Sequence, residues 1–98
     1  MALEFDYPSA QLEAKILMNE TGINEATANQ LIQFAQMTRN LKGSGLEEGA
    51  STRLLVHAAK LIADGVNPVV ACRSCIAEAL TDDAEMLTAV HELSASVF

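Results

Sequence analysis

Apolar residues recur every three or four positions from residue 9 to the end of the chain, which is the spacing of amphipathic helices. Each helical stretch begins with a polar residue of the kind that caps a helix N-terminus. The expected fold is therefore all-α, a small bundle of about five helices. The stretches and their caps are Ser9 to about Glu20, Asn24 to about Leu41, Ser51 to Asp64–Gly65, Asn67–Pro68 to about Leu80, and Asp82 to the C-terminal end.

The same spacing predicts the core and the connections. Gly22 is expected to stop the first helix, and Asp82 with Glu85 three residues later resembles a capping box. Residues 42–50, with three glycines, form the longest predicted loop. Inward-facing side chains are expected at Leu12, Ile16 and Leu17 in the first helix, at Ala28, Leu31, Ile32, Ala35 and Thr38 in the second, and at Met86, Val90, Leu93 and Val97 in the last.

The first seven residues have a different pattern. Residues 3–7 alternate between apolar and acidic side chains, which predicts a half-buried strand that Pro8 ends. A lone strand has no partner with which to form a ladder. Either its sheet lies in sequence outside this chain, or residues 1–8 form an extended arm against the helices.

Composition narrows the class of protein. The 98 residues allow one domain, and a net charge of −7 argues against binding of nucleic acid or an anionic membrane. No apolar run approaches the roughly 20 residues of a membrane helix, and no secretory signal is visible at the N-terminus. Two cysteines without an export signal indicate a reducing compartment, so we expect a soluble cytoplasmic protein.

The third helix is the only predicted helix with a net positive charge. Arg53, His57, Lys60 and Asp64 form one polar stripe, and the opposite face is apolar. A solvated polar face would explain most of this stripe, but Arg53 lies in the first turn, where the helix dipole disfavours a cation. A phosphate bound at this helix start would explain the arginine, and so would pairing with Glu47 or Glu48.

Other chemistry has weaker support in the sequence. Cys72 and Cys75 have C-x-x-C spacing but lie inside a helix that Pro68 has already begun, so core packing is favoured over a redox pair or a zinc site. His91 is expected at the surface or its boundary, and no metal site is predicted. There is no phosphate-loop motif and no catalytic Ser/His/Asp spacing, so the chain by itself is not expected to be an enzyme.

Five segments together resemble the C-terminal region of the CbbQ/NirQ/NorQ branch of MoxR-type AAA+ ATPases. They are Phe5-Asp6-Tyr7-Pro8, Leu41-Lys42-Gly43, Leu46-Glu47-Glu48-Gly49, Ser51-Thr52-Arg53-Leu54-Leu55-Val56 and Leu80-Thr81-Asp82-Asp83. The resemblance implies that residues 1–98 are a helical lid, with residues 1–8 ending the sheet of an absent nucleotide-binding core. It also implies that Arg53 is the sensor-2 arginine, flanked by Ser51 and Thr52 at the helix start.

The resemblance further implies ATP and magnesium as cofactors of a full-length parent that forms a ring, usually a hexamer. The implied partners are the chain's own AAA+ core, a protein with a von Willebrand factor A domain, and a client metalloenzyme such as Rubisco or nitric oxide reductase. The parent would then act as a chaperone-like ATPase. A non-catalytic helical interaction module without nucleotide chemistry is the alternative, and an exposed apolar patch would favour it.

Overall fold

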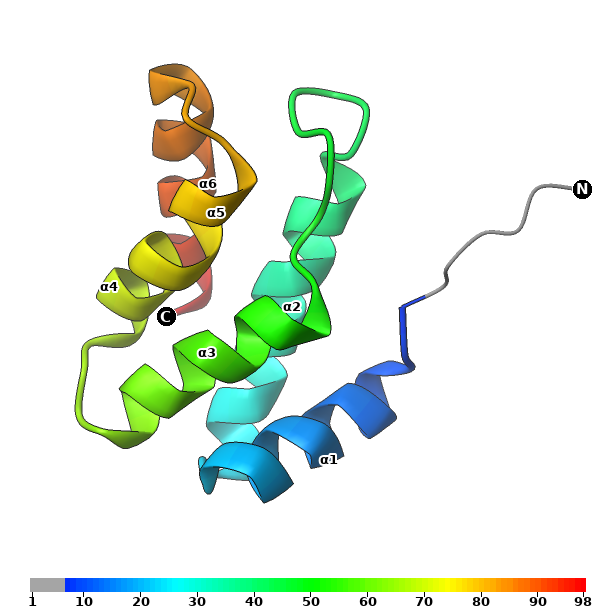
Figure 1. The fold of residues 1–98 in the computed structure, drawn as a ribbon, viewed down its shortest axis with the longest axis vertical. Helices are drawn as coiled ribbons and strands as arrows, with labels where there is room; N and C mark the ends of the chain where they lie inside the picture. Colours follow the sequence, from blue (N-terminus) through cyan, green and yellow to red (C-terminus); the bar gives the residue numbers. More distant parts are fainter. Residues whose placement is uncertain (1–6) are drawn as a thin grey trace, which may run out of the picture.

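The computed structural model describes residues 7–98, and these residues form an all-α bundle that is 73% helical (Figure 1). Residues 68–80, between α3 and α6, form three consecutive helical pieces without a break, so the bundle has five helical segments, as predicted. The elements are α1 (Ala10–Thr21), α2 (Glu25–Asn40), α3 (Thr52–Ala63), α4 (Pro68–Cys72), the π-helix η1 (Arg73–Ala77), α5 (Glu78–Leu80) and α6 (Ala84–Val97).

Local capping explains where the helices begin. The side chains of Ser9, Asn24 and Ser51 each accept a hydrogen bond from the backbone N–H three residues later, and Asn67 accepts from the first turn of α4. The predicted cap Asp82 is wrong by one residue. Asp83 is the cap of α6 and accepts from the N–H groups of Glu85 and Met86, so the capping box is not formed.

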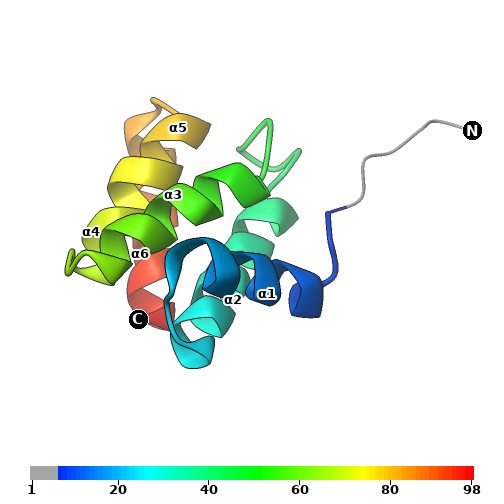
Figure 2. The same ribbon diagram turned by 60° about the horizontal axis from the view of Figure 1, so that its bottom comes forward.

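The core lies around α2. α1 contacts both α2 and α3, and Figure 2 shows α1 crossing in front of these helices. The five residues predicted to face inward on α2 are all buried, together with Phe34. On α1 the prediction is partly wrong, because Leu12 is 52% exposed while Glu13 and Ala14 are buried beside Leu17.

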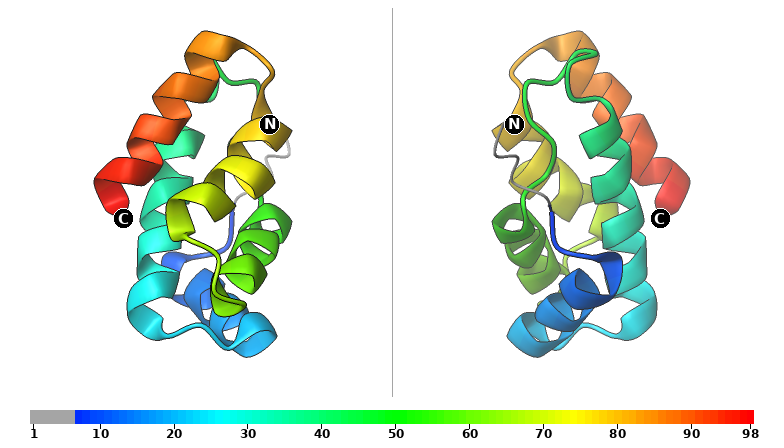
Figure 3. Two further views of the ribbon diagram at one scale, coloured as in Figure 1. Left: turned by 90° about the vertical axis from the view of Figure 1, so that its left-hand side faces the viewer. Right: turned by 90° about the vertical axis from the view of Figure 1, so that its right-hand side faces the viewer.

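Residues 68–97 form a helical hairpin. The α4–η1–α5 segment contacts α3 on one side and α6 on the other, and residues 81–83 join it to α6 (Figure 3). The π turn of η1 was not predicted, because its side chains carry no marker that separates it from an α-helical turn. On α6, Val90 is buried, and Met86, Leu93 and Val97 are half-buried against the core.

The glycine-containing loop between α2 and α3 is anchored to the bundle. Leu46 is buried, and its carbonyl oxygen accepts a hydrogen bond from the N–H of Gly43. The backbone of Gly45 lies so close to Met86 of α6 that a Cβ there would meet the methionine sulfur at 2.7 Å. The loop therefore has a defined path toward the start of α3.

Two further expectations concern the chain as a whole. The predicted strand over residues 3–7 lies almost entirely outside the described residues, and Tyr7 itself has no regular secondary structure. None of the helices in residues 7–98 combines the length and the apolar character needed to cross a membrane.

Candidate functional site

Arg53 lies in the first turn of α3 with its side chain exposed. The Ser51 hydroxyl accepts from the N–H of Leu54, and the N–H groups of Thr52 and Arg53 have no hydrogen-bond partner among the described residues. No acidic residue occupies this first turn. The positive end of the helix dipole and the arginine charge therefore stand together without an anion from α3 itself.

Pairing with Glu47 or Glu48 does not explain Arg53. Within residues 7–98 the ion pairs are Arg39–Glu13 and Arg73–Glu78, and both glutamates of the loop are exposed. The rest of the polar stripe, at His57, Lys60 and Asp64, is exposed as predicted. The guanidinium of Arg53 is therefore available to a group outside the described part of the chain.

Glu13, Arg39 and Thr52 form a polar cluster at the start of α3, and we call it the buried polar cluster because its central carboxylate, that of Glu13, is fully buried while the other two residues are partly buried. Arg39 Nη1 and Nη2 donate to the two carboxylate oxygens of Glu13 at 2.9 and 2.6 Å. Thr52 Oγ1 donates to Glu13 Oε2 at 2.9 Å. The side chains of Arg39 and Glu13 are only 10% and 1% exposed, so this bidentate pair joins α2 to α1 largely away from solvent, and the Thr52 hydroxyl adds α3.

The residues immediately before α3 are attached to the last turn of α2. Thr38 Oγ1 accepts from the N–H of Ala50 at 3.0 Å, and Arg39 Nε donates to the carbonyl oxygen of Ala50 at 3.0 Å. Gly49 lies so close to Arg39 that an added Cβ would be 2.5 Å from its Cγ and 2.6 Å from its Cα. Backbone contact, not a positive φ, explains the glycine at this position.

Tyr7 adds the segment before α1 to this arrangement. Its ring centroid is 3.8 Å from Cζ of Arg39, which is a cation–π geometry. One guanidinium therefore contacts the entering chain, the carboxylate of α1 and the backbone that leads into α3.

Sequence reasoning singled out Arg53 as a candidate and missed this cluster. Glu13 looks like an ordinary solvated acid of α1, and Arg39 looks like a cation favoured near a helix C-terminus. The available clue was that Glu13 lies on the same face as Leu17, four residues later, and so shares its inward direction. Only the fold places Arg39 opposite it.

The two cysteines differ in their surroundings. Cys72 is fully buried in the core, as predicted, and burial, assisted by the neighbouring Cys75, raises the pKa of its thiol to about 12. Cys75 is only partly buried, and burial also raises the pKa of its thiol. Raised pKa values keep both thiols protonated near neutral pH, the opposite of an activated redox pair.

No three potential metal ligands are grouped closely enough to hold an ion anywhere in residues 7–98.

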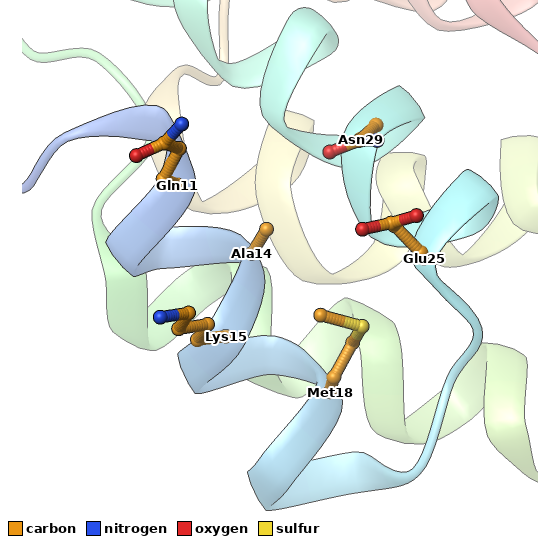
Figure 4. A pocket seen from close by; sticks show the side chains of 6 residues that line it. All are labelled: Gln11, Ala14, Lys15, Met18, Glu25 and Asn29. Atoms are coloured by element: carbon orange, nitrogen blue, oxygen red, sulfur yellow. The ribbon is translucent and has the colours of Figure 1, made fainter.

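Two hollows on the surface lie apart from Arg53. One, of about 430 Å³, is open between α1 and the first turns of α2, and Figure 4 shows Lys15 and Met18 on one wall and Glu25 and Asn29 on the other. The second, of about 270 Å³, lies between η1 and α6 and includes Arg73 and the exposed His91. Neither hollow is lined by Arg53 or by a member of the buried polar cluster.

Comparison with known proteins agrees with the resemblance. The model of the CbbQ/NirQ/NorQ C-terminal family matches residues 13–97. The chain belongs to this family. Among its relatives, the denitrification regulatory protein NirQ of Pseudomonas aeruginosa is 50% identical over 93 residues, which is 95% of this chain. Protein CbbQ of Hydrogenophilus thermoluteolus and protein NorQ of Paracoccus denitrificans are each 41% identical, over 99% and 100% of this chain.

This CbbQ/NirQ/NorQ C-terminal domain spans about a third of the length of these curated relatives, 36% in each case. The matched range includes Arg53 and all three members of the buried polar cluster, whereas Tyr7 precedes it.

Proposed function

We propose that this CbbQ/NirQ/NorQ C-terminal domain is the helical lid of a MoxR-type AAA+ ATPase, and that Arg53 is the sensor-2 arginine. The observation that carries the proposal is an exposed arginine without an acidic partner in the described chain, at the start of α3. This helix start is held on both sides of Ser51, because the backbone of Ala50 is bonded to the end of α2 and the Thr52 hydroxyl is bonded to Glu13 of α1. Such a residue is well suited to bind an anion presented by another domain.

The comparisons support this proposal in two ways. About two thirds of each relative's length lies outside the matched region, which is enough chain for a separate nucleotide-binding core. NirQ carries the name of a denitrification regulatory protein, which favours a regulatory role over a metabolic one. ATP in that core would supply the phosphate group, with magnesium neutralising its charge.

The contribution of this chain is a movable positive charge. When the lid closes on the core, the guanidinium of Arg53 contacts the phosphates of ATP, and the two unpartnered N–H groups at the start of α3 face the same anion. Hydrolysis removes that contact and releases the lid, so the lid angle follows the state of the nucleotide.

In the assembled protein, six such subunits form a ring in the cytoplasm, and the movement of each lid changes the conformation of the ring. The ring works with a von Willebrand factor A domain protein and activates a client metalloenzyme, with Rubisco and nitric oxide reductase as the candidate clients. These partners are the ones that the family resemblance implies. Activation of the client belongs to the complete ATPase and not to the isolated lid.

The test is the Arg53→Ala variant of the complete ATPase that carries this segment. Removing a charged donor aimed at developing phosphate charge costs on the order of 10²–10³ in rate, and we expect at least a roughly tenfold loss of ATP turnover. Arg53→Lys should restore turnover only partly, because an ammonium cannot reproduce the planar fork.

His57→Ala and Lys60→Ala are matched controls, since both residues are exposed on the same stripe of α3 and lie further from the helix start. They should retain wild-type turnover. Wild-type turnover by Arg53→Ala, with its melting temperature unchanged, would refute the sensor-2 assignment and favour a non-catalytic interaction module.

A further inference from the structure

Arg53 is exposed, but the backbone that carries it is held by buried groups on two other helices. We propose that Arg39, together with Glu13 and Thr52, is a positioning device that sets the direction of Arg53 toward the nucleotide. This inference rests on the proposed function and deepens it, because it assigns a role in turnover to three residues that cannot reach the phosphates themselves.

The chemistry of the buried polar cluster favours a geometric role. Burying a carboxylate and a guanidinium is costly, and well-packed apolar residues would stabilise the same contact between helices at least as well. A bidentate pair, in contrast, fixes the relative direction of two side chains, because both N–H groups must meet both oxygens. The cluster therefore fixes the relative orientation of the helices that carry these side chains, which an apolar contact would not fix.

The location of the cluster makes that orientation relevant to Arg53. Thr52 immediately precedes Arg53, and its hydroxyl donates to the carboxylate of Glu13. Two residues earlier, both backbone polar groups of Ala50 are bonded to the end of α2. A side chain projecting from a fixed helical turn loses less conformational entropy when it binds than one on a mobile turn. The arrangement therefore prepares Arg53 for its contact before the lid closes.

The same guanidinium also contacts the segment that enters the lid. The ring of Tyr7 is stacked on Arg39, at a distance of 3.8 Å from its Cζ. A displacement of the chain at Tyr7 would therefore shift Arg39, whose other hydrogen bonds hold the start of α3. This contact therefore couples the position of the chain at Tyr7 to the direction of Arg53.

The experiment uses the complete ATPase and the smallest change available, Thr52→Val. This variant keeps the branched shape of the side chain but removes the donor to Glu13. Because a misplacement of about 1 Å can cost up to about 10²-fold in rate, we expect kcat to fall by roughly three- to tenfold, with a smaller change in KM. Thr52→Ser restores the hydroxyl and should recover turnover. Arg39→Lys keeps the charge, loses the fork, and should also lower kcat.

A double variant separates positioning from general destabilisation. If the cluster acts through Arg53, adding Thr52→Val to Arg53→Ala causes no further loss of turnover, because the aimed group is already absent. Thr88→Val, which removes an exposed hydroxyl bonded only within α6, is the control and should behave as wild type. Melting temperatures are measured for every variant.

The outcomes distinguish this inference from the proposed function. Wild-type turnover by Thr52→Val, or losses that multiply in the double variant, overturns the positioning role even if Arg53→Ala is impaired. Wild-type turnover by Arg53→Ala overturns the sensor-2 assignment and the positioning role together.

Discussion

Replacing Gly49 by alanine tests whether the start of α3 is as tightly held as the structure indicates. Gly49 is buried, and its backbone does not have a positive φ, so an alanine meets no conformational penalty of the left-handed kind. The new Cβ would instead lie 2.6 Å from the Cα of Arg39, and this is backbone that cannot rotate away. This clash is relieved only if the segment before α3 moves away from the end of α2.

The magnitude of the effect follows from the distances. Ordinary carbon contacts lie at about 3.5–4.0 Å, so the segments must separate by about 1 Å. Overpacking of this kind costs about 1–3 kcal/mol. The two hydrogen bonds of Ala50 would lengthen as well, and each contributes about 0.5–1.5 kcal/mol. We expect Gly49→Ala to lower the free energy of unfolding by about 2–4 kcal/mol, which corresponds to a decrease in melting temperature of roughly 8–30 °C.

The assay is urea unfolding followed by circular dichroism at 222 nm, with Gly43 as the comparison. Gly43 has φ 84° and nothing within 4 Å of an added Cβ, so its alanine variant is strained by conformation alone. Asparagine tolerates that conformation, so Gly43→Asn should cost less than Gly43→Ala. Gly49→Asn should cost at least as much as Gly49→Ala, because the clash is steric. A loss below about 0.5 kcal/mol for Gly49→Ala would show that the segment yields and would refute the reasoning.

Two other predictions test the core thiol and the last helix. Burial raises the pKa of Cys72 from 9.0 to about 12, so the unfolded chain releases this proton first and the free energy of unfolding falls as pH rises from about 9 toward 12. Between pH 8 and pH 10, urea titrations of the wild type should lose about 1 kcal/mol more stability than those of Cys72→Ala; parallel losses would contradict the burial effect. Asp83→Ala should lower the free energy of unfolding by about 1 kcal/mol, while Asp82→Ala should change it little; the reverse order would restore Asp82 as the cap.

Much of the helical architecture could be predicted from the sequence, because helix starts and stops depend on local chemistry. Ser9, Asn24 and Ser51 each cap a helix through a bond to an N–H only three residues away. The register of α2 was also predicted correctly, since its inward face is apolar except for Thr38 in the last turn. The error at Asp82 arose because two adjacent aspartates are equivalent as caps until the chain direction before the helix is known.

The buried polar cluster depended on the tertiary structure. A hydrophobic pattern places Leu12 inside and Glu13 outside, and the fold reverses this assignment. The reversal is possible because Arg39, 26 residues later, supplies both the opposite charge and the two donors that a buried carboxylate needs.

Arg53 illustrates the division between sequence and fold. The sequence determined that an arginine stands in the first turn of a capped helix, because Ser51 and the following apolar spacing mark that helix locally. It could not determine that the arginine lacks an acidic partner in the described chain, or that Thr52 beside it is bonded to Glu13, 39 residues away. Contacts between residues so far apart depend on how α1, α2 and α3 pack together, and no local pattern contains that packing.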